Sequence, residues 1–273
     1  MALAMTRSGA RIAWDSFGSL DQPPLLLIQG FSAQMLGWRP GFCQRLADEG
    51  FRVIRFDNRD VGQSQRYPEG GYVLADLADD TAALLDSLGI ESAHIVGQSM
   101  GGMIAQLLAS RHAARVRSLG LIYTAASSAH YLGREEIEVR MSAPTPTTRD
   151  EYVPFYVANE SACASPGYPQ DIAWLRQLGG EIWDRGWDAD GVQRQLQALL
   201  SAPDRIEALR AIRVPTTVIG GDGDQLISYA ASLEVHELIA GSTLKIFPGM
   251  GHELPPPLWD EIATLLATNA RRA

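Results

Sequence analysis

The chain contains short apolar runs that each end in turn-forming residues. Six such runs occupy residues 24–28, 51–56, 93–96, 118–123, 214–219 and 243–247. A strand that is covered on both faces of a parallel sheet is apolar along its whole length, whereas a half-exposed strand alternates between apolar and polar residues. The runs therefore predict largely buried strands of a parallel sheet.

Segments with apolar residues at helical spacing lie between these runs. They cover residues 41–49, 73–88, 103–111 and 256–269, and Gly89 is a typical stop for the second of them. Strands that alternate with helices predict βαβ units, and hence an α/β fold with a mostly parallel, doubly wound sheet. Ligands of such sheets bind beyond the carboxyl ends of the strands.

The stretch of residues 125–201 breaks this alternation. It has no convincing strand, is rich in proline and aromatic residues, and contains helical patterns at 172–183 and 192–200. We interpret it as a helical cap inserted over the sheet edge, with residues 1–124 and 202–273 forming the core. The alternative is a set of helices that only pack against the core, and the two interpretations are compatible.

The composition narrows the classes of partner. A formal net charge of −9 argues against binding to nucleic acid, because phosphate binding needs a basic surface. No apolar run is long enough to span a membrane and no signal-peptide layout is present, so we expect a cytoplasmic location and no membrane partner. Cys43 and Cys163 are expected to be buried small hydrophobes, neither a disulfide nor a catalytic pair. No metal-ligand cluster, phosphate loop or cofactor motif is found, so neither metal nor cofactor is expected, and the oligomeric state stays open.

Residues 97–101 form a Gly-Gln-Ser-Met-Gly sequence between an apolar run and a helical pattern. A Gly-x-Ser-x-Gly in a strand–turn–helix setting is the nucleophile elbow pattern. The flanking glycines lack the Cβ atoms that would clash in so sharp a turn. The turn lifts the hydroxyl of Ser99 out of the sheet, toward the positive end of the following helix. The alternative is a glycine-rich turn that only packs.

A serine needs a base to accept its proton and an acid to orient that base. Among five histidines, His252 is the candidate base, because it lies in a glycine-rich loop after the last predicted strand. Asp224 is the candidate acid in the loop after the preceding strand, while Asp222 is expected to hydrogen-bond main chain in that turn. The alternative is that both are ordinary turn aspartates.

An acyl-transfer site also needs donors for the oxyanion. The main-chain N–H of Met100, which follows the candidate nucleophile, is one predicted donor. The N–H of Phe31, in the loop after the run at 24–28, is the other. Gly30 lets the main chain of this loop pass close to a substrate.

Four matches, which together span nearly the whole chain, make the sequence resemble the α/β-hydrolase family. They are Gly30-Phe31, the Asp-Asn-Arg-Asp-Val-Gly-Gln-Ser sequence at 57–64, the elbow at 97–101, and the late loops with Asp224 and His252. The resemblance implies the α/β-hydrolase fold and a Ser-Asp-His triad. Residues 57–64 are similar to a turn that the family uses to brace the site, without a part in the chemistry.

Within that family, residues 56–60 and 249–255 resemble the aclacinomycin methylesterase-like group of small esterases. The sequence departs from many relatives at two positions. Gln29 stands where many have histidine, and Asp60 stands where many have glycine. Neither change removes a catalytic group, but both concern the shape of the loops around the site.

These residues predict a serine esterase that cleaves carboxylic esters of small molecules through an acyl-enzyme. Short-chain or aryl esters are the expected substrates. A carbon–carbon bond hydrolase, or a perhydrolase or haloperoxidase, is an alternative because such enzymes use the same triad. A haloalkane dehalogenase or epoxide hydrolase would need aspartate in place of Ser99. A ligand-binding protein that keeps the fold without catalysis is a further alternative.

Overall fold

The computed structural model describes residues 1–132 and 144–273. An eight-stranded sheet runs through the molecule in the order β1-β2-β4-β3-β5-β6-β7-β8. Its strands are β1 (Ala2–Met5), β2 (Arg11–Phe17), β3 (Pro24–Ile28), β4 (Arg52–Phe56), β5 (Ala93–Gln98), β6 (Val116–Ile122), β7 (Thr216–Gly221) and β8 (Thr243–Phe247). Neighbouring strands pair in parallel from β4 through β3, β5, β6 and β7 to β8. At the other end of the sheet, β1 pairs antiparallel with β2, and β2 pairs antiparallel with β4. A strand forms at each predicted run; β1 and β2 were not predicted.

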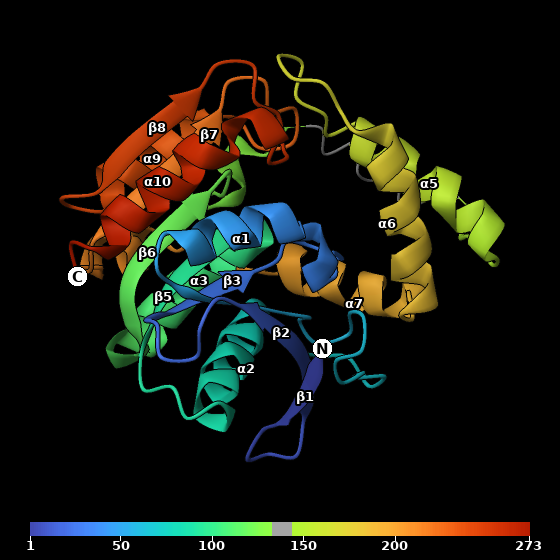
Figure 1. The fold of residues 1–273 in the computed structure, drawn as a ribbon, viewed down its shortest axis with the longest axis horizontal. Helices are drawn as coiled ribbons and strands as arrows, with labels where there is room; N and C mark the ends of the chain where they lie inside the picture. The colour runs from blue at the N-terminus through green and yellow to red at the C-terminus, as the bar shows by residue number, and fades with distance from the viewer. Residues whose placement is uncertain (133–143) are drawn as a thin grey trace.

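Helices cover both faces of the sheet (Figure 1). They are α1 (Pro40–Asp48), α2 (Leu74–Ser87), α3 (Met100–Arg111), α5 (Arg149–Ser161), α6 (Ile172–Asp184), α7 (Ala189–Leu200), α8 (Ile206–Ala211), α9 (Ala230–Leu238) and α10 (Trp259–Ala270). Short 3₁₀ helices occupy η1 (Met35–Gly37), η2 (Ala113–Arg115), η3 (Ser128–His130) and η4 (Pro256–Leu258). Helices α2, α3, α8 and α9 pack in one hydrophobic core, and α1 and α10 in the other.

The sequence of β3 shows why the predicted strands are largely apolar. Leu26 and Ile28 belong to the core beneath α2 and α3, whereas Leu25 and Leu27 belong to the core beneath α1 and α10. Successive side chains of a strand point to opposite faces, so a strand with helices on both faces needs apolar residues at every position. This two-sided burial confirms the predicted α/β architecture.

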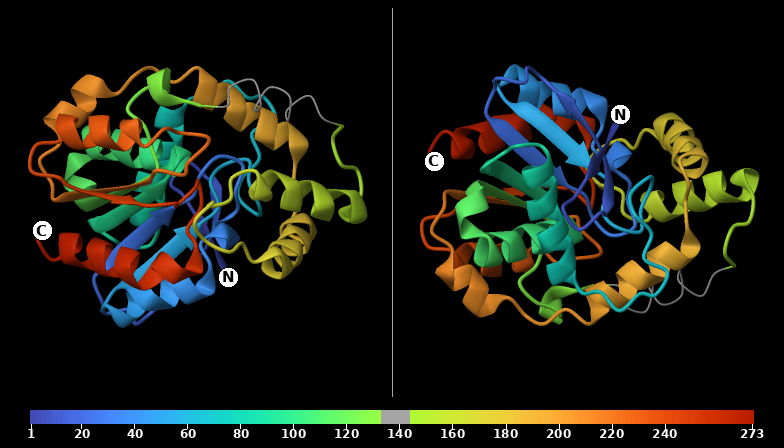
Figure 2. Two further views of the ribbon diagram at one scale, coloured as in Figure 1. Left: turned by 90° about the horizontal axis from the view of Figure 1, so that it is seen from above. Right: turned by 90° about the horizontal axis from the view of Figure 1, so that it is seen from below.

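Helices α5, α6 and α7 lie between β6 and β7 in the sequence and beside the sheet in space (Figures 1 and 2). Helices α5 and α6 share a small aromatic cluster, in which Tyr152 of α5 contacts Trp183 of α6 and Trp187, which lies between α6 and α7. We propose that these helices form the cap expected for residues 125–201. Residues 133–143 of that expected cap lie outside the described residues.

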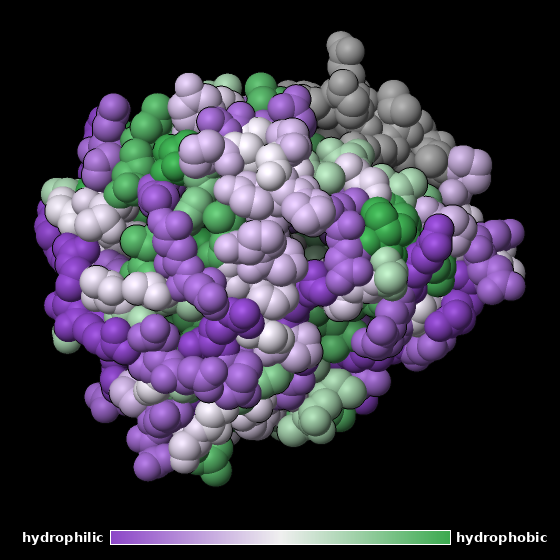
Figure 3. Space-filling model, turned by 45° about the horizontal axis from the view of Figure 1, so that its top comes forward, coloured by the Kyte–Doolittle hydropathy of each residue, from purple (hydrophilic) through white to green (hydrophobic). Residues whose placement is uncertain are grey.

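The surface shown in Figure 3 is mostly hydrophilic, with apolar residues scattered over it. Within residues 1–132 and 144–273, no helix combines the length and apolar character needed to cross a membrane. Cys43 is buried in α1, as expected, whereas Cys163 is only partly buried, so the expectation of two buried cysteines is wrong for the second.

Candidate active site

Ser99 lies in a sharp turn between β5 and α3. Its φ of 53° and ψ of −124° lie in a region that non-glycine residues rarely adopt. A Cβ atom on Gly97 would lie 2.2 Å from the carbonyl oxygen of Gly101. A Cβ atom on Gly101 would lie 2.2 Å from the carbonyl oxygen of Ile28 in β3. Both glycines are therefore required where the sequence pattern places them, and the turn holds the serine at the carboxyl end of β5.

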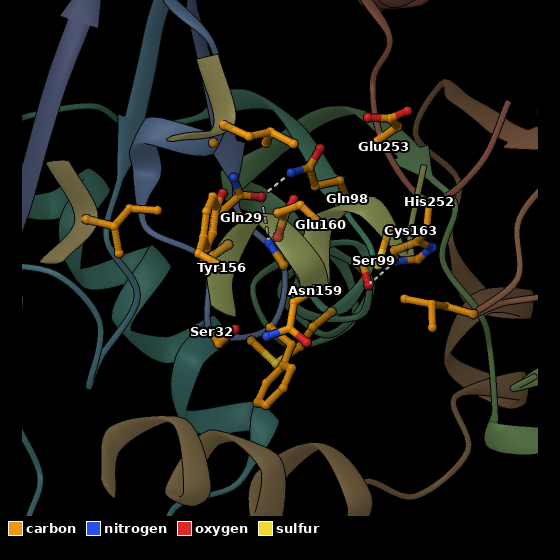
Figure 4. A pocket seen from close by; sticks show the side chains of 18 of the residues that line it. Gln29, Ser32, Gln98, Ser99, Tyr156, Asn159, Glu160, Cys163, His252 and Glu253 are labelled. Atoms are coloured by element: carbon orange, nitrogen blue, oxygen red, sulfur yellow. Dashed lines mark hydrogen bonds between the residues drawn. The ribbon is translucent and has the colours of Figure 1, made fainter. Parts of the chain in front are cut away.

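The structure brings Ser99, His252 and Asp224 into one hydrogen-bonded chain (Figure 4 shows the first link). The Oγ of Ser99 lies 2.8 Å from Nε2 of His252, and Nδ1 of His252 lies 2.7 Å from Oδ2 of Asp224. An ionised carboxylate only accepts hydrogen bonds, so Nδ1 carries the imidazole proton and Nε2 is left to accept the serine proton. The side chain of Asp224 is 1% exposed and that of His252 is 10% exposed.

Main-chain groups fix the orientation of the Asp224 carboxylate. Its other oxygen, Oδ1, accepts hydrogen bonds from the N–H groups of Leu226 at 2.8 Å and Ile227 at 3.0 Å. The neighbouring Asp222 bonds main chain in the turn, as expected, because its Oδ1 accepts from the N–H of Gly249 at 2.6 Å. The two aspartates of this loop therefore have different partners, and only one of them faces the imidazole.

None of the other four histidines lines the cavity that contains Ser99 in the described part of the chain. His94 pairs with Ser118, His112 with Asp79, His130 with Glu234, and His236 with Ser242. Burial, with a smaller effect of Arg117, lowers the pKa of His94 to about 4. These histidines have local structural partners, which leaves His252 as the one beside the serine.

The loop after β3 approaches Ser99 closely. A Cβ atom on Gly30 would lie 3.3 Å from Cβ of Ser99, so the loop passes directly over the serine. The N–H of Gly30 already donates to Oε1 of Gln29 at 2.9 Å. Within the described residues, the N–H groups of Phe31 and Met100 donate to no protein acceptor, and both residues line the cavity. These two N–H groups are thus available to a ligand.

Gln29, one of the two departures from the family pattern, belongs to a partly buried polar network. The hydroxyl of Tyr123 donates to Oε1 of Gln98 at 2.5 Å, and Nε2 of Gln98 donates to Oε1 of Gln29. The ring of Tyr123 lies 4.5 Å from the ring of His252, between centroids. Burial raises the pKa of Tyr123 well above its usual value, so its hydroxyl stays protonated and able to donate. The network links the imidazole to the loop after β3, and the sequence analysis missed Gln98 and Tyr123.

Asp60, the second departure, joins the core to the cap. It lies at the positive φ of 66°, where glycine is favoured, and its carboxylate accepts two hydrogen bonds from Arg194 of α7 at 2.9 and 2.8 Å. Burial raises its pKa and the hydrogen bonds of Arg194 lower it, with a net downward shift. In the same turn, Asp57 accepts from Arg185 at 2.8 Å and from the N–H of Met35 at 2.8 Å.

A second contact joins the cap to the histidine loop. The N–H of His252 donates to the carbonyl oxygen of Cys163 at 3.0 Å. The N–H of Gly251 donates to Oγ of Ser165 at 2.9 Å, and the N–H of Ser165 donates to the carboxylate of Glu253 at 2.7 Å. Ser165 is buried, so the bond from Gly251 to its hydroxyl is shielded from water. The loop that holds the imidazole is therefore built partly from residues of the cap.

A cavity of about 400 Å³ lies between the cap and the sheet edge, with Ser99 and His252 in its wall. Most of its lining is apolar or aromatic, including Phe31, Trp38, Met100, Met103, Phe155, Trp174, Leu175, Trp187, Val192, Leu196, Leu199 and Ile227. Tyr156, Asn159 and Glu160 reach it from α5, as Figure 4 shows. Across residues 1–132 and 144–273, no cluster of His, Cys, Asp and Glu side chains could hold a metal ion.

Comparison with known proteins identifies the fold. A family model described as the alpha/beta hydrolase fold matches residues 23–154. Among solved structures, the enol-lactonase from Burkholderia xenovorans LB400 superposes with a TM-score of 0.82 at 23% identity, over 99% of this chain and 100% of that chain. The chain therefore has the α/β-hydrolase fold, and the predicted fold class is confirmed.

Esterases are among its relatives. The chain is 25% identical to the rhodomycin D methylesterase DauP of Streptomyces sp. (strain C5) over 293 residues, which cover 98% of each chain. It is 26% identical to the putative carbamate hydrolase RutD of Variovorax paradoxus (strain S110) over 245 residues, or 88% of each chain. The predicted resemblance to α/β-hydrolase esterases is thereby confirmed.

Proposed function

We propose that the protein is a serine hydrolase that cleaves carboxylic esters through an acyl-enzyme. The observation that carries the proposal is the hydrogen-bonded chain from Ser99 through His252 to Asp224 in the wall of a largely apolar cavity. A nucleophile, a base within hydrogen-bond reach and a group that orients the base are the components that acyl transfer needs.

In the first half of the reaction, Oγ of Ser99 attacks the carbonyl carbon of the ester while Nε2 of His252 takes the serine proton. Asp224 stabilises the imidazolium that forms. The carbonyl oxygen becomes an oxyanion, which accepts hydrogen bonds from the N–H groups of Phe31 and Met100. When the tetrahedral intermediate collapses, the bond to the alcohol oxygen breaks, and the alcohol leaves with the proton from His252.

In the second half, water replaces the alcohol. His252 takes a proton from the water, whose oxygen attacks the acyl carbon, and the acid leaves as the proton returns to Oγ of Ser99. Each oxyanion donor contributes on the order of 3 kcal/mol to stabilisation of the transition state. Main-chain donors suit this task because the fold fixes their direction before the substrate binds.

The size and lining of the cavity support the proposal that the substrates are short-chain or aryl esters of small molecules. Its volume of about 400 Å³ lies at the lower end of the range for small-molecule sites, and aromatic side chains from both the core and the cap line it. The relative DauP is described as a methylesterase, and RutD as a putative carbamate hydrolase. An ester hydrolase is therefore among the proteins to which this chain is similar.

A p-nitrophenyl acyl series, from acetate to octanoate, tests the proposal against a Ser99→Ala variant. We expect a burst of nitrophenol followed by turnover for the wild type, and a rate at least about 10³-fold lower for the variant. No turnover of any ester, or equal activity of the variant, would contradict the proposal. A vinylogous diketone compared with a phenyl ester separates ester from carbon–carbon bond hydrolysis, and a large preference for the diketone would contradict an esterase.

A further inference from the structure

Gln195 of α7 is a polar residue that is fully buried and uses both ends of its side chain. Its Oε1 accepts a hydrogen bond from the N–H of Ser32 at 2.9 Å, and its Nε2 donates to the carbonyl oxygen of Arg59 at 2.8 Å. Ser32 follows β3 and Arg59 follows β4, so one cap side chain joins two loops of the core. It does not line the cavity among the described residues.

The loop that Gln195 contacts is strained. Ser32 has a φ of 59°, in the left-handed region that a serine adopts only when its surroundings hold it there. No glycine occupies this position to relieve the strain. The hydrogen bond from the Ser32 N–H to Gln195 is a contact that holds this conformation in place.

The pattern of N–H groups along this loop is consistent with a positioning role. The N–H of Gly30 donates to the side chain of Gln29, and the N–H of Ser32 donates to that of Gln195. The N–H of Phe31, which lies between them, donates to no acceptor in the described part of the chain. Two buried amide side chains therefore hold the outer N–H groups, and the middle one is left open to a ligand.

We propose that Gln195 is a positioning residue for the oxyanion loop: it fixes Ser32 and thereby aims the N–H of Phe31 at the oxygen that becomes negatively charged. This inference rests on the proposed esterase function. The cap then does more than enclose the substrate, because a side chain of α7 completes the geometry of a donor that belongs to the core.

The alternative role for Gln195 is only to hold the cap against the core. The adjacent residue, Arg194, allows this role to be distinguished from the positioning of the oxyanion loop. Arg194 also joins α7 to the core, through two hydrogen bonds to Asp60, but no bond of its side chain reaches residues 29–34 in the described structure. Loss of Arg194 therefore weakens docking without releasing Ser32. Loss of Gln195 weakens docking and releases Ser32 as well.

The test compares Gln195→Leu and Gln195→Asn with two controls, Arg194→Met and Gln197→Leu; Gln197 is exposed on the same helix. The readouts are kcat and KM for a p-nitrophenyl ester, and the inhibition constant of a trifluoromethyl ketone with the same acyl group. The ketone adds to Ser99 and forms an oxyanion, so its affinity reports the donors directly. Melting temperature is followed in parallel for every variant.

For Gln195→Leu we expect kcat to fall by about 10- to 100-fold, with KM changed by less than about threefold. The inhibition constant of the ketone should rise by a similar factor. Gln195→Asn, which is one methylene too short to reach both partners, should show the same pattern and carries the test if the leucine variant does not fold. Arg194→Met should lower the melting temperature but leave kcat and ketone affinity within about threefold of wild type.

Wild-type kcat and ketone affinity in the folded Gln195 variants would overturn the inference, as would an equal loss of ketone affinity in Arg194→Met. The Ser99→Ala variant separates this failure from failure of the proposed function. If that variant is inactive while the Gln195 variants behave as wild type, only the positioning role is wrong. If it is as active as wild type, the esterase proposal itself is wrong.

Discussion

Substitution of Asp224 by asparagine changes the protonation of the site while keeping its shape. The N–H groups of Leu226 and Ile227 both donate to Oδ1, so an amide at this position must place its oxygen there. Its NH₂ group then faces Nδ1 of His252, which lies 2.7 Å from Oδ2 in the wild type. Two donors cannot share a hydrogen bond, so the imidazole proton moves to Nε2, where it blocks acceptance of the proton from Ser99.

The size of this effect follows from the tautomer. With the base in its wrong form, kcat should fall by about 10⁴-fold, which corresponds to about 5.5 kcal/mol in the activation free energy. KM should stay within about threefold, because the cavity and the oxyanion donors are unchanged. Burst kinetics with p-nitrophenyl butyrate measure the acylation rate, and thermal denaturation shows whether the variant is folded.

Asp222→Asn is the matched control. Its Oδ1 accepts from the N–H of Gly249, and an amide oxygen does the same. We expect kcat of this variant to stay within about twofold of wild type, since the imidazole is not involved. An Asp224→Asn variant that keeps more than a tenth of wild-type kcat, or an equal loss in Asp222→Asn, would refute the reasoning.

Three further substitutions test the fold around the site. Gly101→Ala places a Cβ atom 2.2 Å from the Ile28 carbonyl oxygen, so the free energy of unfolding should fall by about 3 kcal/mol in denaturant titrations, and a loss below about 1 kcal/mol would contradict the close packing. Burial lowers the pKa of His94 to about 4 from its usual 6.5, so as the pH falls this imidazole takes up a proton in the unfolded chain before it does so in the folded one. The free energy of unfolding should therefore decrease between pH 6.5 and pH 4, by about 2 kcal/mol more in wild type than in His94→Asn. Parallel pH curves for the two proteins would refute this effect of His94. Asp15→Ala removes the ion-pair partner of the buried Arg55, so the free energy of unfolding in urea should fall by about 2 kcal/mol. Glu207→Ala, which removes an exposed ion pair, should lower it by less than about 0.5 kcal/mol. Equal losses in the two variants would contradict this ranking.

The sequence predicted the central strands because burial on both faces makes most of their positions apolar. It did not predict β1 and β2, which pair at an edge of the sheet. In β2, only Ile12 and Ala13 are buried, and Arg11, Asp15 and Ser16 interrupt the apolar pattern. Strand β1 forms one edge of the sheet and β2 lies beside it, and most residues of both strands are exposed or only partly buried, so their sequences carry a weaker apolar signal.

Helix α5 was not predicted either. Pro154 lies inside it, and Tyr152 is its one buried residue, so neither propensity nor an apolar stripe marks it. A local signal was nevertheless present, since Thr148 and Glu151 form a capping box at its start. Capping residues can identify a helix whose interior does not.

The candidate triad could be predicted because each member follows a strand in a loop with a recognisable pattern. Gln195 and Ser165 could not, because they act on main-chain groups far away in the sequence. Gln195 bonds the N–H of Ser32, 163 residues earlier, and Ser165 bonds the N–H of Gly251, 86 residues later. Such contacts depend on how the cap packs on the core, and they leave no periodicity or motif in the chain.

The central claim is that Ser99 becomes acylated during turnover. Its most direct test is intact-protein mass spectrometry after rapid acid quench of a reaction with p-nitrophenyl butyrate, followed by peptide mapping. We expect an added mass equal to one butyryl group, located on the peptide that contains Ser99, and no such adduct in Ser99→Ala. An adduct on another residue, or steady turnover without an adduct while deacylation is slowed at low pH, would contradict the claim.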